Sequence, residues 1–354
     1  MQSTDSSIHV ALAADDNYFK GLIVTAWSIA ANCAPSRHVT IHVLDGGISD
    51  ANWRDLLAAT HPFNCALDRI AVNPDASFDG LGEWHGASKM TYARLLLPAL
   101  LRDIRHVIYS DVDFVWLGDI SRLWDLADKD LILQYVPERT KGREVGAVER
   151  AWIESRGFTL TPGKYFCAGM IVMNLALFRK ENLHAKILKF LSDNGGTAPF
   201  VDQTALNVFM DRRTDTGELP QNWQAETGNP EECSKDVDLA IHFSSDAPWK
   251  SLHKANHLLT EPHILWHAIY AHIYGTTVWR SLRSCNSALD IVFCRALYLL
   301  ASNLGIVRAL IRAYLRIAGK KDGIPYLEPY LHKITFARFP TFRGLKAGLP
   351  ADPA

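Results

Sequence analysis

The sequence predicts an α/β fold in which a mostly parallel sheet is flanked by helices and followed by a helical, basic C-terminal region. In the first part of the chain, short apolar runs rich in β-branched residues alternate with helical patterns, as in parallel sheets. From about residue 276 the pattern changes to helices and basic residues. The chain has 354 residues, of which 48% are hydrophobic, which is enough for a large core. We therefore predict a main domain over 1–265 and a helical, basic region over 266–354.

The strands and helices are expected in alternation. Apolar runs of β-forming residues predict strands at 8–14, 39–45, 66–72 and 106–112. Helical patterns predict helices between these strands, at about 18–33, 49–59 and 88–101. Further strands are expected in DLILQYV, CAGMIVMN and DLAIHFS, with a helix from Asp202 to Met210 among them.

Two carboxylates stand one residue apart in an apolar stretch. The segment HVIYSDVDFVWLGD places Asp111 and Asp113 at the carboxyl end of a predicted strand, where ligands bind in open α/β sheets. Two like charges that face one cavity repel each other unless a cation neutralises them. Carboxylates suit Mg²⁺ and Mn²⁺, which often complete their coordination with substrate phosphates. A divalent metal is therefore the candidate partner, and the plain alternative is a pair of turn or cap residues.

A third metal ligand is expected from another part of the chain. His242, in DLAIHFSSDAPWK, ends a later apolar run and is the best candidate. Imidazole beside two carboxylates favours Mn²⁺, with Mg²⁺ as the alternative. The plain interpretation of His242 is a hydrogen-bonded structural histidine.

The basic residues are concentrated near the C-terminus. Residues 276–354 hold 12 Lys and Arg against 4 Asp and Glu, whereas the rest of the chain holds 25 against 34. Arg308, Arg312 and Arg316 are four residues apart and form one cationic stripe on a predicted helix. This stripe fits either a solvated helix face or an amphipathic helix on an anionic membrane surface. No nucleic-acid partner is expected, because no recognisable module is present.

Cysteine usage and the apolar runs favour a cytoplasmic protein. The six cysteines form no CxxC pair, which argues against a zinc ribbon or a dense disulfide framework. The N-terminus has no basic region typical of a signal peptide. No transmembrane segment is expected, because the longest apolar stretch, 291–307, is short and contains Arg295. The expected localisation is cytoplasmic, or peripheral on the inner face of the plasma membrane.

Six blocks of the chain resemble, in order, the retaining glycosyltransferases of family eight, and most of all the bacterial lipopolysaccharide α-galactosyltransferases and α-glucosyltransferases. The blocks are ALAADDNYFKGLIVTAWSIAAN, SKMTYARLLLPALL, VIYSDVDFVWLGDISRLW, YFCAGMIVMNLALFRK, FVDQTALNVFM and IHFSSDAPWK. The resemblance covers residues 8 to about 250 and implies a GT-A type catalytic domain that uses a UDP-sugar and Mn²⁺. It implies that Asp111, Asp113 and His242 hold the metal.

The resemblance also implies a nucleotide-binding edge in AADDNY. Asp15 would accept a hydrogen bond from uracil, Asn17 would contact the nucleotide and Tyr18 would present its ring to the base. Ala13 would contribute backbone groups. The alternative is that Asp15 and its neighbours cap the helix that follows.

Three further residues match catalytic positions of the family. The resemblance implies that Arg94 bridges the acidic motif and the donor sugar, that Asp202 accepts from a sugar hydroxyl, and that Gln203 faces the anomeric carbon. The alternatives are a surface salt bridge for Arg94 and a favourable helix-dipole charge for Asp202. Further candidates for the donor site are Val112, Cys167, Ala168, Ser245 and Lys250.

The chain departs from the family pattern at the donor site. Cys167 stands where the family often has Asn, and a thiol is the weaker hydrogen-bonding group. The closing loop HFSSDAPWK is one residue shorter than usual, with Ser245 in place of Gly and Ala247 in place of a lysine that meets the diphosphate. Lys250 is the candidate substitute for that lysine.

The resulting hypothesis is a hexosyltransferase. It would move galactose or glucose from UDP-galactose or UDP-glucose, with retention, to a saccharide acceptor such as lipopolysaccharide or another glycolipid. The alternative is a sugar-nucleotide-binding protein of the same fold that has lost or altered its transfer activity. A Rossmann dehydrogenase is disfavoured, because IHVALAADDNY lacks the G-x-G-x-x-G fingerprint.

Overall fold

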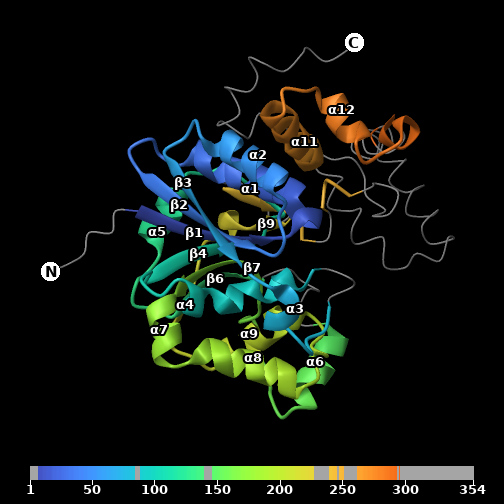
Figure 1. The fold of residues 1–354 in the computed structure, drawn as a ribbon. Coiled ribbons are helices and arrows are strands. Elements are labelled where there is room, and N and C mark those ends of the chain that lie inside the picture. The colour runs from blue at the N-terminus through green and yellow to red at the C-terminus, as the bar shows by residue number, and fades with distance from the viewer. Residues whose placement is uncertain are drawn as a thin grey trace. The chain divides into compact units, whose positions relative to one another are not determined.

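The computed structural model describes residues 7–83, 88–138, 146–226, 239–244, 247–250, 261–292 and 295. Figure 1 shows their helices and strands. The chain divides into two compact units, of which the first comprises Met1–Val112 and Asp119–Trp223. The second comprises Asp113–Gly118 and Gln224–Ala354. The predicted division into 1–265 and 266–354 stays a prediction.

The first unit is built on a mixed sheet of seven strands in the order β3-β2-β1-β4-β7-β6-β8. These strands are β1 (Ser7–Ala14), β2 (His38–Asp45), β3 (Cys65–Ala71), β4 (His106–Ser110), β6 (Leu133–Pro137), β7 (Phe166–Asn174) and β8 (Thr216–Glu218). Strands β3, β2, β1 and β4 run parallel, as do β6 and β8, whereas β7 is antiparallel to both of its neighbours. The predicted α/β fold with a mostly parallel sheet is therefore confirmed.

Helices flank this sheet. They are η1 (Asp16–Tyr18), α1 (Phe19–Asn32), α2 (Asp50–Thr60), α3 (Pro74–Ser77), η2 (Lys89–Leu96), α4 (Leu97–Leu100), α5 (Ile120–Leu126), α6 (Ala147–Glu154), α7 (Leu175–Lys180), α8 (Leu183–Asp193), α9 (Val201–Met210) and η3 (Gln221–Trp223). Four of the α-helices begin after a residue whose side chain accepts a backbone N–H of the first turn: Ser49, Asn73, Asp119 and Asn174.

Most predicted elements are present with shifted ends, and two of them differ more in the structure. The segment predicted as one helix over 88–101 is a 3₁₀ helix, η2, followed by the short α4. Pro98 has no N–H and cannot bond the carbonyl of Arg94, so a continuous α-helix is interrupted here, and the Leu97 N–H bonds that carbonyl instead. The strand predicted over 106–112 ends at Ser110, although the Asp111 N–H still bonds the Gly169 carbonyl of β7.

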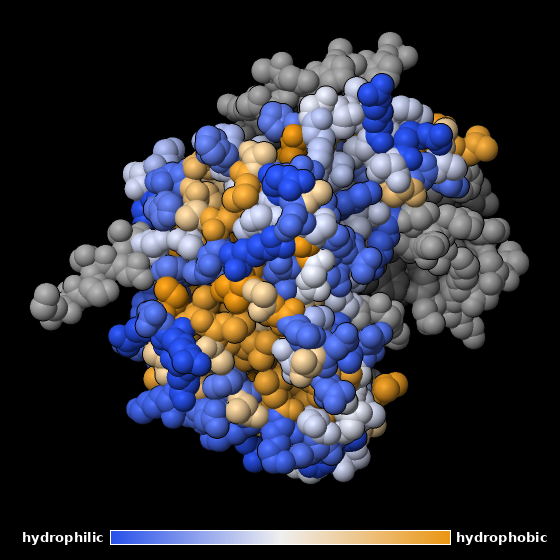
Figure 2. All heavy atoms as spheres, in the orientation of Figure 1, coloured by the Kyte–Doolittle hydropathy of each residue, from blue (hydrophilic) through white to orange (hydrophobic). Residues whose placement is uncertain are grey.

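The core of the first unit lies between the sheet and the helices on its faces. Tyr109 and Ile171 on adjacent strands and Leu95 in η2 are almost completely buried in one cluster. Figure 2 shows apolar side chains gathered on the viewed face over α4 and the elements beside it. In α4, Leu100 is 38% exposed, and next to it Leu96 is partly buried against the core cluster.

The second unit contains a three-stranded sheet in the order β5-β10-β9. Its elements are β5 (Phe114–Trp116), β9 (Ala225–Glu226), β10 (Ala240–His242), α11 (Glu261–Ile273) and α12 (Val278–Arg283). Strand β10 is antiparallel to β5 and parallel to β9. A Cβ on Gly118 would lie 2.6 Å from a methyl carbon of Leu239, so only glycine fits beside β10 without a shift.

The predicted membrane-binding residues lie outside the described part of the chain. Arg308, Arg312 and Arg316 are among them, so the basic stripe stays a prediction. Across the described residues, the helices fall short of the length and apolar character that a membrane span requires.

Asn207 fastens α9 to the start of β7, and its replacement by alanine is expected to destabilise the first unit. Its amide accepts from the Phe166 N–H and donates to the Phe166 carbonyl, both at 2.9 Å. Asn207→Ala leaves both buried groups unpaired, so we expect the free energy of unfolding in urea to fall by about 3 kcal/mol. The control is Asn52→Ala, which removes an exposed amide bonded to Asp16. An equal loss in both variants would contradict this account.

Candidate functional site

The parallel pairing of β1 and β4 brings two predicted motifs to one edge of the sheet. Val10 pairs with Ile108 and Ala11 pairs with Tyr109, so the segments that follow both strands leave the sheet at the same end. AADDNY begins in the last two residues of β1 and continues beyond it, and Asp111 follows β4. This edge is where ligands bind in open α/β sheets.

Asp111 is held by groups on neighbouring elements. Its backbone N–H donates to the Gly169 carbonyl at 2.7 Å. Its Oδ1 accepts from the Tyr109 hydroxyl at 2.8 Å and from Arg94 Nη2 at 2.9 Å. Val112 is buried, and its carbonyl accepts from Thr25 Oγ1 in α1 at 2.9 Å. The turn after β4 is thus fixed on both sides.

Arg94 joins two of the predicted carboxylates. Its side chain is 3% exposed, and Nε lies 2.8 Å from Asp202 Oδ2 while Nη2 bonds Asp111. Nη1 donates to the Ala168 carbonyl, and the guanidinium lies over the Tyr109 ring, 4.4 Å from its centroid. Burial acts to lower the pKa of Arg94, but the two carboxylates outweigh burial and raise it. Arg94 is therefore a permanent buried cation, and the surface salt bridge considered for it is excluded.

Asp202 lies in the first turn of α9 and is 1% exposed. Burial raises its pKa, against the opposing effects of Arg94 and of the Thr91 hydroxyl, which donates to Oδ1 at 2.8 Å. The preceding residue, Val201, has a φ of 44°, which is unfavourable for a β-branched side chain. Such strain is tolerated where the surroundings enforce it, often at functional sites.

Asp113 and His242 form a pair in the second unit. His242 Nε2 lies 3.3 Å from Asp113 Oδ1, and its ring stacks on Phe114 with centroids 4.3 Å apart. His242 is 2% exposed. Asp113 Oδ1 is buried, and among the described residues it has no hydrogen-bond partner of acceptable geometry.

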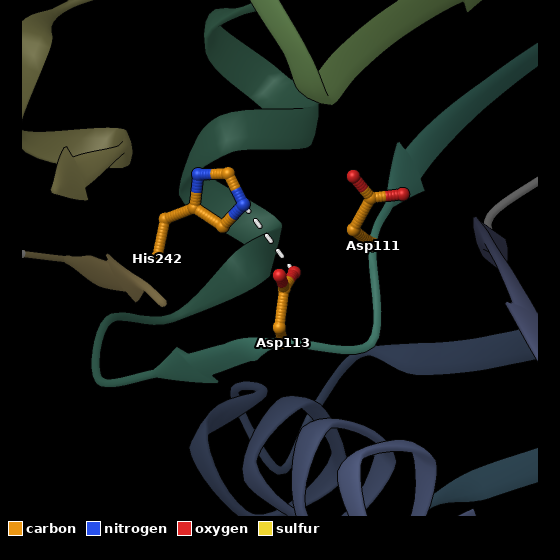
Figure 3. Close-up of side chains that lie close together, drawn as sticks. All are labelled: Asp111, Asp113 and His242. Atoms are coloured by element: carbon orange, nitrogen blue, oxygen red, sulfur yellow. Dashed lines mark ion pairs between the residues drawn. The ribbon is translucent and has the colours of Figure 1, made fainter. Parts of the chain in front are cut away.

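The three residues predicted to hold a metal lie together. One ligand atom from each of Asp111, Asp113 and His242 can be chosen so that all lie within 4.8 Å of one another. Figure 3 shows the imidazole and the two carboxylates directed toward a common space. Two carboxylate oxygens and one imidazole nitrogen are a donor set that suits a divalent cation.

Gln203 follows Asp202 on α9 and is half-buried. Its Oε1 accepts from the Ala168 N–H at 3.0 Å, and its Nε2 donates to the Tyr165 hydroxyl at 2.8 Å. Cys167 is a half-buried cysteine that lies between Tyr165 and Ala168 in the sequence. The amide of Gln203 therefore has a defined orientation.

The nucleotide edge has the local structure of a helix cap. Asp15 Oδ1 accepts from the N–H groups of Asn17 and Tyr18, at 2.9 and 3.2 Å. Ala13 is 8% exposed, Asp15 and Tyr18 are half-buried and Asn17 is exposed. The capping interpretation of Asp15 is thus correct, and nucleotide binding there stays a prediction.

The closing loop is described only in part. Ser245 lies outside the described residues. Lys250 is exposed, and its backbone N–H bonds the Ala247 carbonyl at 2.9 Å in a turn. The role of Lys250 as the substitute for the missing loop lysine stays a prediction.

Sequence analysis missed the hydroxyl groups that orient these side chains. Thr91 bonds Asp202, Tyr109 bonds Asp111 and Tyr165 bonds Gln203. Thr91 lies three residues before Arg94, and Tyr109 lies two residues before Asp111. This closeness in sequence could have suggested that both hydroxyl groups belong to the site. No sequence signal connects Tyr165 to Gln203, which is 38 residues away.

Comparison with known proteins identifies the family of this chain. The family model "Glycosyl transferase family 8" matches residues 9–253. The chain therefore belongs to glycosyl transferase family 8, and the predicted family is confirmed.

Three bacterial proteins are among the relatives of this chain. General stress protein A of Bacillus subtilis is 31% identical over 227 residues, which are 63% of this chain and 75% of that protein. The lipopolysaccharide 1,3-galactosyltransferase of Salmonella typhimurium is 26% identical over 59% of this chain and 61% of its own length. The lipopolysaccharide 1,2-glucosyltransferase of Escherichia coli is 24% identical, over 59% and 60% respectively. The match thus spans less than two thirds of both lipopolysaccharide enzymes.

Solved structures show the same fold. The galactosyltransferase LgtC, crystallised in complex with donor and acceptor sugar analogues, superimposes with a TM-score of 0.62 at 23% identity. The match covers 75% of this chain and 96% of LgtC. The GT-A type architecture predicted from the sequence is thereby confirmed.

Proposed function

We propose that the protein is a retaining, metal-dependent hexosyltransferase that moves galactose or glucose from a UDP-sugar to a saccharide acceptor. The observation that carries this proposal is the grouping of Asp111, Asp113 and His242, whose ligand atoms lie within 4.8 Å of one another. Membership of glycosyl transferase family 8 and the lipopolysaccharide glucosyltransferase and galactosyltransferase among the relatives support it.

The residues present fit a bound Mn²⁺. Asp113 Oδ1 is a buried oxygen without an aligned donor among the described residues, and such an atom is costly unless a cation or donor meets it. Asp111, Asp113 and His242 would hold the ion, with diphosphate oxygens in its remaining positions. The bound ion would stabilise negative charge on the departing UDP as a Lewis acid.

The buried arginine supplies a second positive charge. Arg94 holds Asp111 through Nη2 and Asp202 through Nε of one planar group, at 2.9 and 2.8 Å. A guanidinium keeps its charge at any working pH and fixes the geometry of two oxygens at once. We propose that Asp202, oriented by Arg94 and Thr91, accepts a hydrogen bond from a hydroxyl of the donor sugar.

The proposed transfer occurs on one face of the sugar. The acceptor oxygen bonds to the anomeric carbon as the bond from that carbon to the UDP oxygen breaks, and the acceptor proton passes to the departing phosphate oxygen. A neutral amide is a weak nucleophile, so the proposed role of Gln203 is electrostatic. Its carbonyl dipole would stabilise positive charge on the sugar as the bond breaks.

The remaining donor contacts and the cellular setting are parts of the same proposal. We propose that residues of AADDNY contact the nucleotide. We also propose that Val112, Cys167 and Ala168 contact the donor. The acceptor would be lipopolysaccharide or another glycolipid, and the basic region after residue 276 would hold the protein at an anionic membrane surface on the cytoplasmic side. Liposome flotation with and without residues 276–354 tests this part: equal recovery of both proteins in the soluble fraction would contradict it.

The test of the proposed function is release of UDP. The purified protein is incubated with UDP-galactose, UDP-glucose and other UDP-sugars, with and without Mn²⁺ and a saccharide acceptor. We expect Mn²⁺-dependent release from one hexose donor. Binding of UDP-sugars without release under any condition would instead support the sugar-nucleotide-binding alternative, which the altered closing loop motivates.

Gln203→Ala is expected to separate turnover from binding. Loss of the carbonyl dipole should lower kcat for UDP release by about 100-fold, because that dipole acts where charge develops. UDP affinity, measured by calorimetry in the presence of Mn²⁺, should stay unchanged. A collapse of UDP affinity would show that Gln203 is a structural residue.

A further inference from the structure

A buried hydrogen-bonded chain leads from α6 to Gln203. Glu149, in α6, is 1% exposed, although its side chain is a carboxylate. Its oxygens accept from the Tyr165 hydroxyl at 3.0 and 3.2 Å and from Thr204 Oγ1 at 2.5 Å. Tyr165 in turn accepts from Gln203 Nε2 at 2.8 Å. The chain thus connects α6 to the residue proposed to face the anomeric carbon.

Every bond in this chain has a fixed direction. The Ala168 N–H can only donate, so it requires the oxygen of the Gln203 amide and leaves the nitrogen to face Tyr165. That nitrogen can only donate, so the Tyr165 oxygen accepts and its own hydrogen points to Glu149. The Phe200 N–H likewise donates to Thr204 Oγ1 at 3.1 Å, which leaves the Thr204 hydrogen for Glu149. An ionised carboxylate, which only accepts, closes the chain consistently.

Burial and hydrogen bonding act on Glu149 in opposite directions. Burial outweighs the hydrogen bonds from Thr204 and Tyr165, so the pKa of Glu149 is raised above its usual value. A buried carboxylate is expensive unless donors meet it, and here two hydroxyl donors do. A reversed amide would turn the partly positive NH₂ group of Gln203 toward the sugar, where the proposed mechanism needs the partly negative oxygen.

We propose that Glu149 and Tyr165 are positioning residues for sugar transfer: through a one-way chain of hydrogen bonds they hold the Gln203 amide with its oxygen toward the donor sugar. This inference rests on the proposed function. Neither residue touches the substrate in this account, so both act only through Gln203.

A double-mutant cycle on kcat tests the proposal. Tyr165→Phe should lower kcat for Mn²⁺-dependent UDP release from the active hexose donor by roughly 10- to 100-fold, as for other residues that orient a functional group. KM should stay nearly unchanged. In the Gln203→Ala background, Tyr165→Phe should have no further effect on kcat, because the group it orients is gone. Equal losses in both backgrounds, or no loss in the native background, would overturn the proposal.

A matched control and a second variant complete the design. Tyr135→Phe also removes a buried hydroxyl, from a ring that stacks on Phe166 with centroids 4.2 Å apart, and should leave kcat unchanged. If Tyr165→Phe does not fold, Glu149→Gln enters the same cycle with the same criterion. The amide introduced by Glu149→Gln can donate a hydrogen bond to the Tyr165 hydroxyl, whereas the chain requires Tyr165 to donate at this point.

The side-chain amide of Gln203 gives a readout independent of activity. Its ¹H–¹⁵N signal, assigned by its loss in Gln203→Ala, should shift and exchange faster with water in Tyr165→Phe, and should not change in Tyr135→Phe. An unchanged signal in Tyr165→Phe would overturn the chain itself. No UDP release by the wild-type protein would reject the proposed function, whereas release with equal mutant losses in both backgrounds would reject only the positioning role.

Discussion

Replacing Asp113 by asparagine is expected to lower Mn²⁺-dependent UDP release by at least about 100-fold. The side chain keeps its shape, but an amide oxygen carries no net charge and is a poorer ligand for a divalent ion. Asp113 Oδ1 also lies 3.3 Å from His242 Nε2, so the substitution weakens the interaction that orients the His242 ring. Release is measured over a Mn²⁺ titration, and ion binding is followed separately by paramagnetic resonance of free Mn²⁺.

The control removes an exposed carboxylate that is not among the candidate metal ligands. Asp125 is 58% exposed and pairs with Arg37 at 2.8 Å, so Asp125→Asn should leave both activity and Mn²⁺ binding unchanged. Chelation of the wild-type protein with EDTA should abolish UDP release, and added Mn²⁺ should restore it. If Asp113→Asn binds Mn²⁺ and turns over like the wild-type protein, the metal site is assigned to the wrong residues.

Local sequence patterns predicted several of the strands and helices in order and the position of the acidic pair at a strand end. The strands β1 and β4 are mostly buried and apolar, and the change to polar residues lies close to the end of each strand. That β1 and β4 are parallel neighbours, which brings AADDNY and Asp111 to one edge, became known only from the structure. His242 was a candidate because it ends a later apolar run, and the family resemblance then agreed with that choice. It lies 129 residues after Asp113 in the chain and nonetheless belongs to the same group of ligand atoms.

Contacts between distant residues could not be read from such patterns. Arg94 in TYARL has the spacing of an ordinary helical residue, yet it is 3% exposed between two carboxylates. Glu149 looks like a surface acid in an amphipathic helix, yet it accepts from Tyr165 and Thr204 in the interior. Burial of a charged residue depends on which partner the fold brings to it, and periodicity carries no information about that partner.

Replacing Arg94 by methionine is expected to lower the free energy of unfolding by about 3–5 kcal/mol, because it leaves the buried carboxylate of Asp202 without a cation. Asp202 is 1% exposed and would lose its cation. Asp111, whose side chain is 29% exposed, would be less affected because water reaches it. The measurement is urea unfolding of the purified variants.

A double variant shows whether the loss of stability in Arg94→Met comes from the unpaired carboxylate or from lost packing. Arg94→Met combined with Asp202→Leu removes both members of the buried pair, and such replacements recover much of the stability that a single substitution loses. If lost packing around the arginine stem were the cause, the double variant would be no more stable than Arg94→Met alone. Lys189→Met serves as the control, since Lys189 is 74% exposed and pairs with Asp193 on the surface, where ion pairs contribute less than about 1 kcal/mol. Because Arg94 also orients Asp111 and Asp202, the stable double variant should still fail to release UDP, which separates the contribution of the pair to folding from its proposed contribution to transfer.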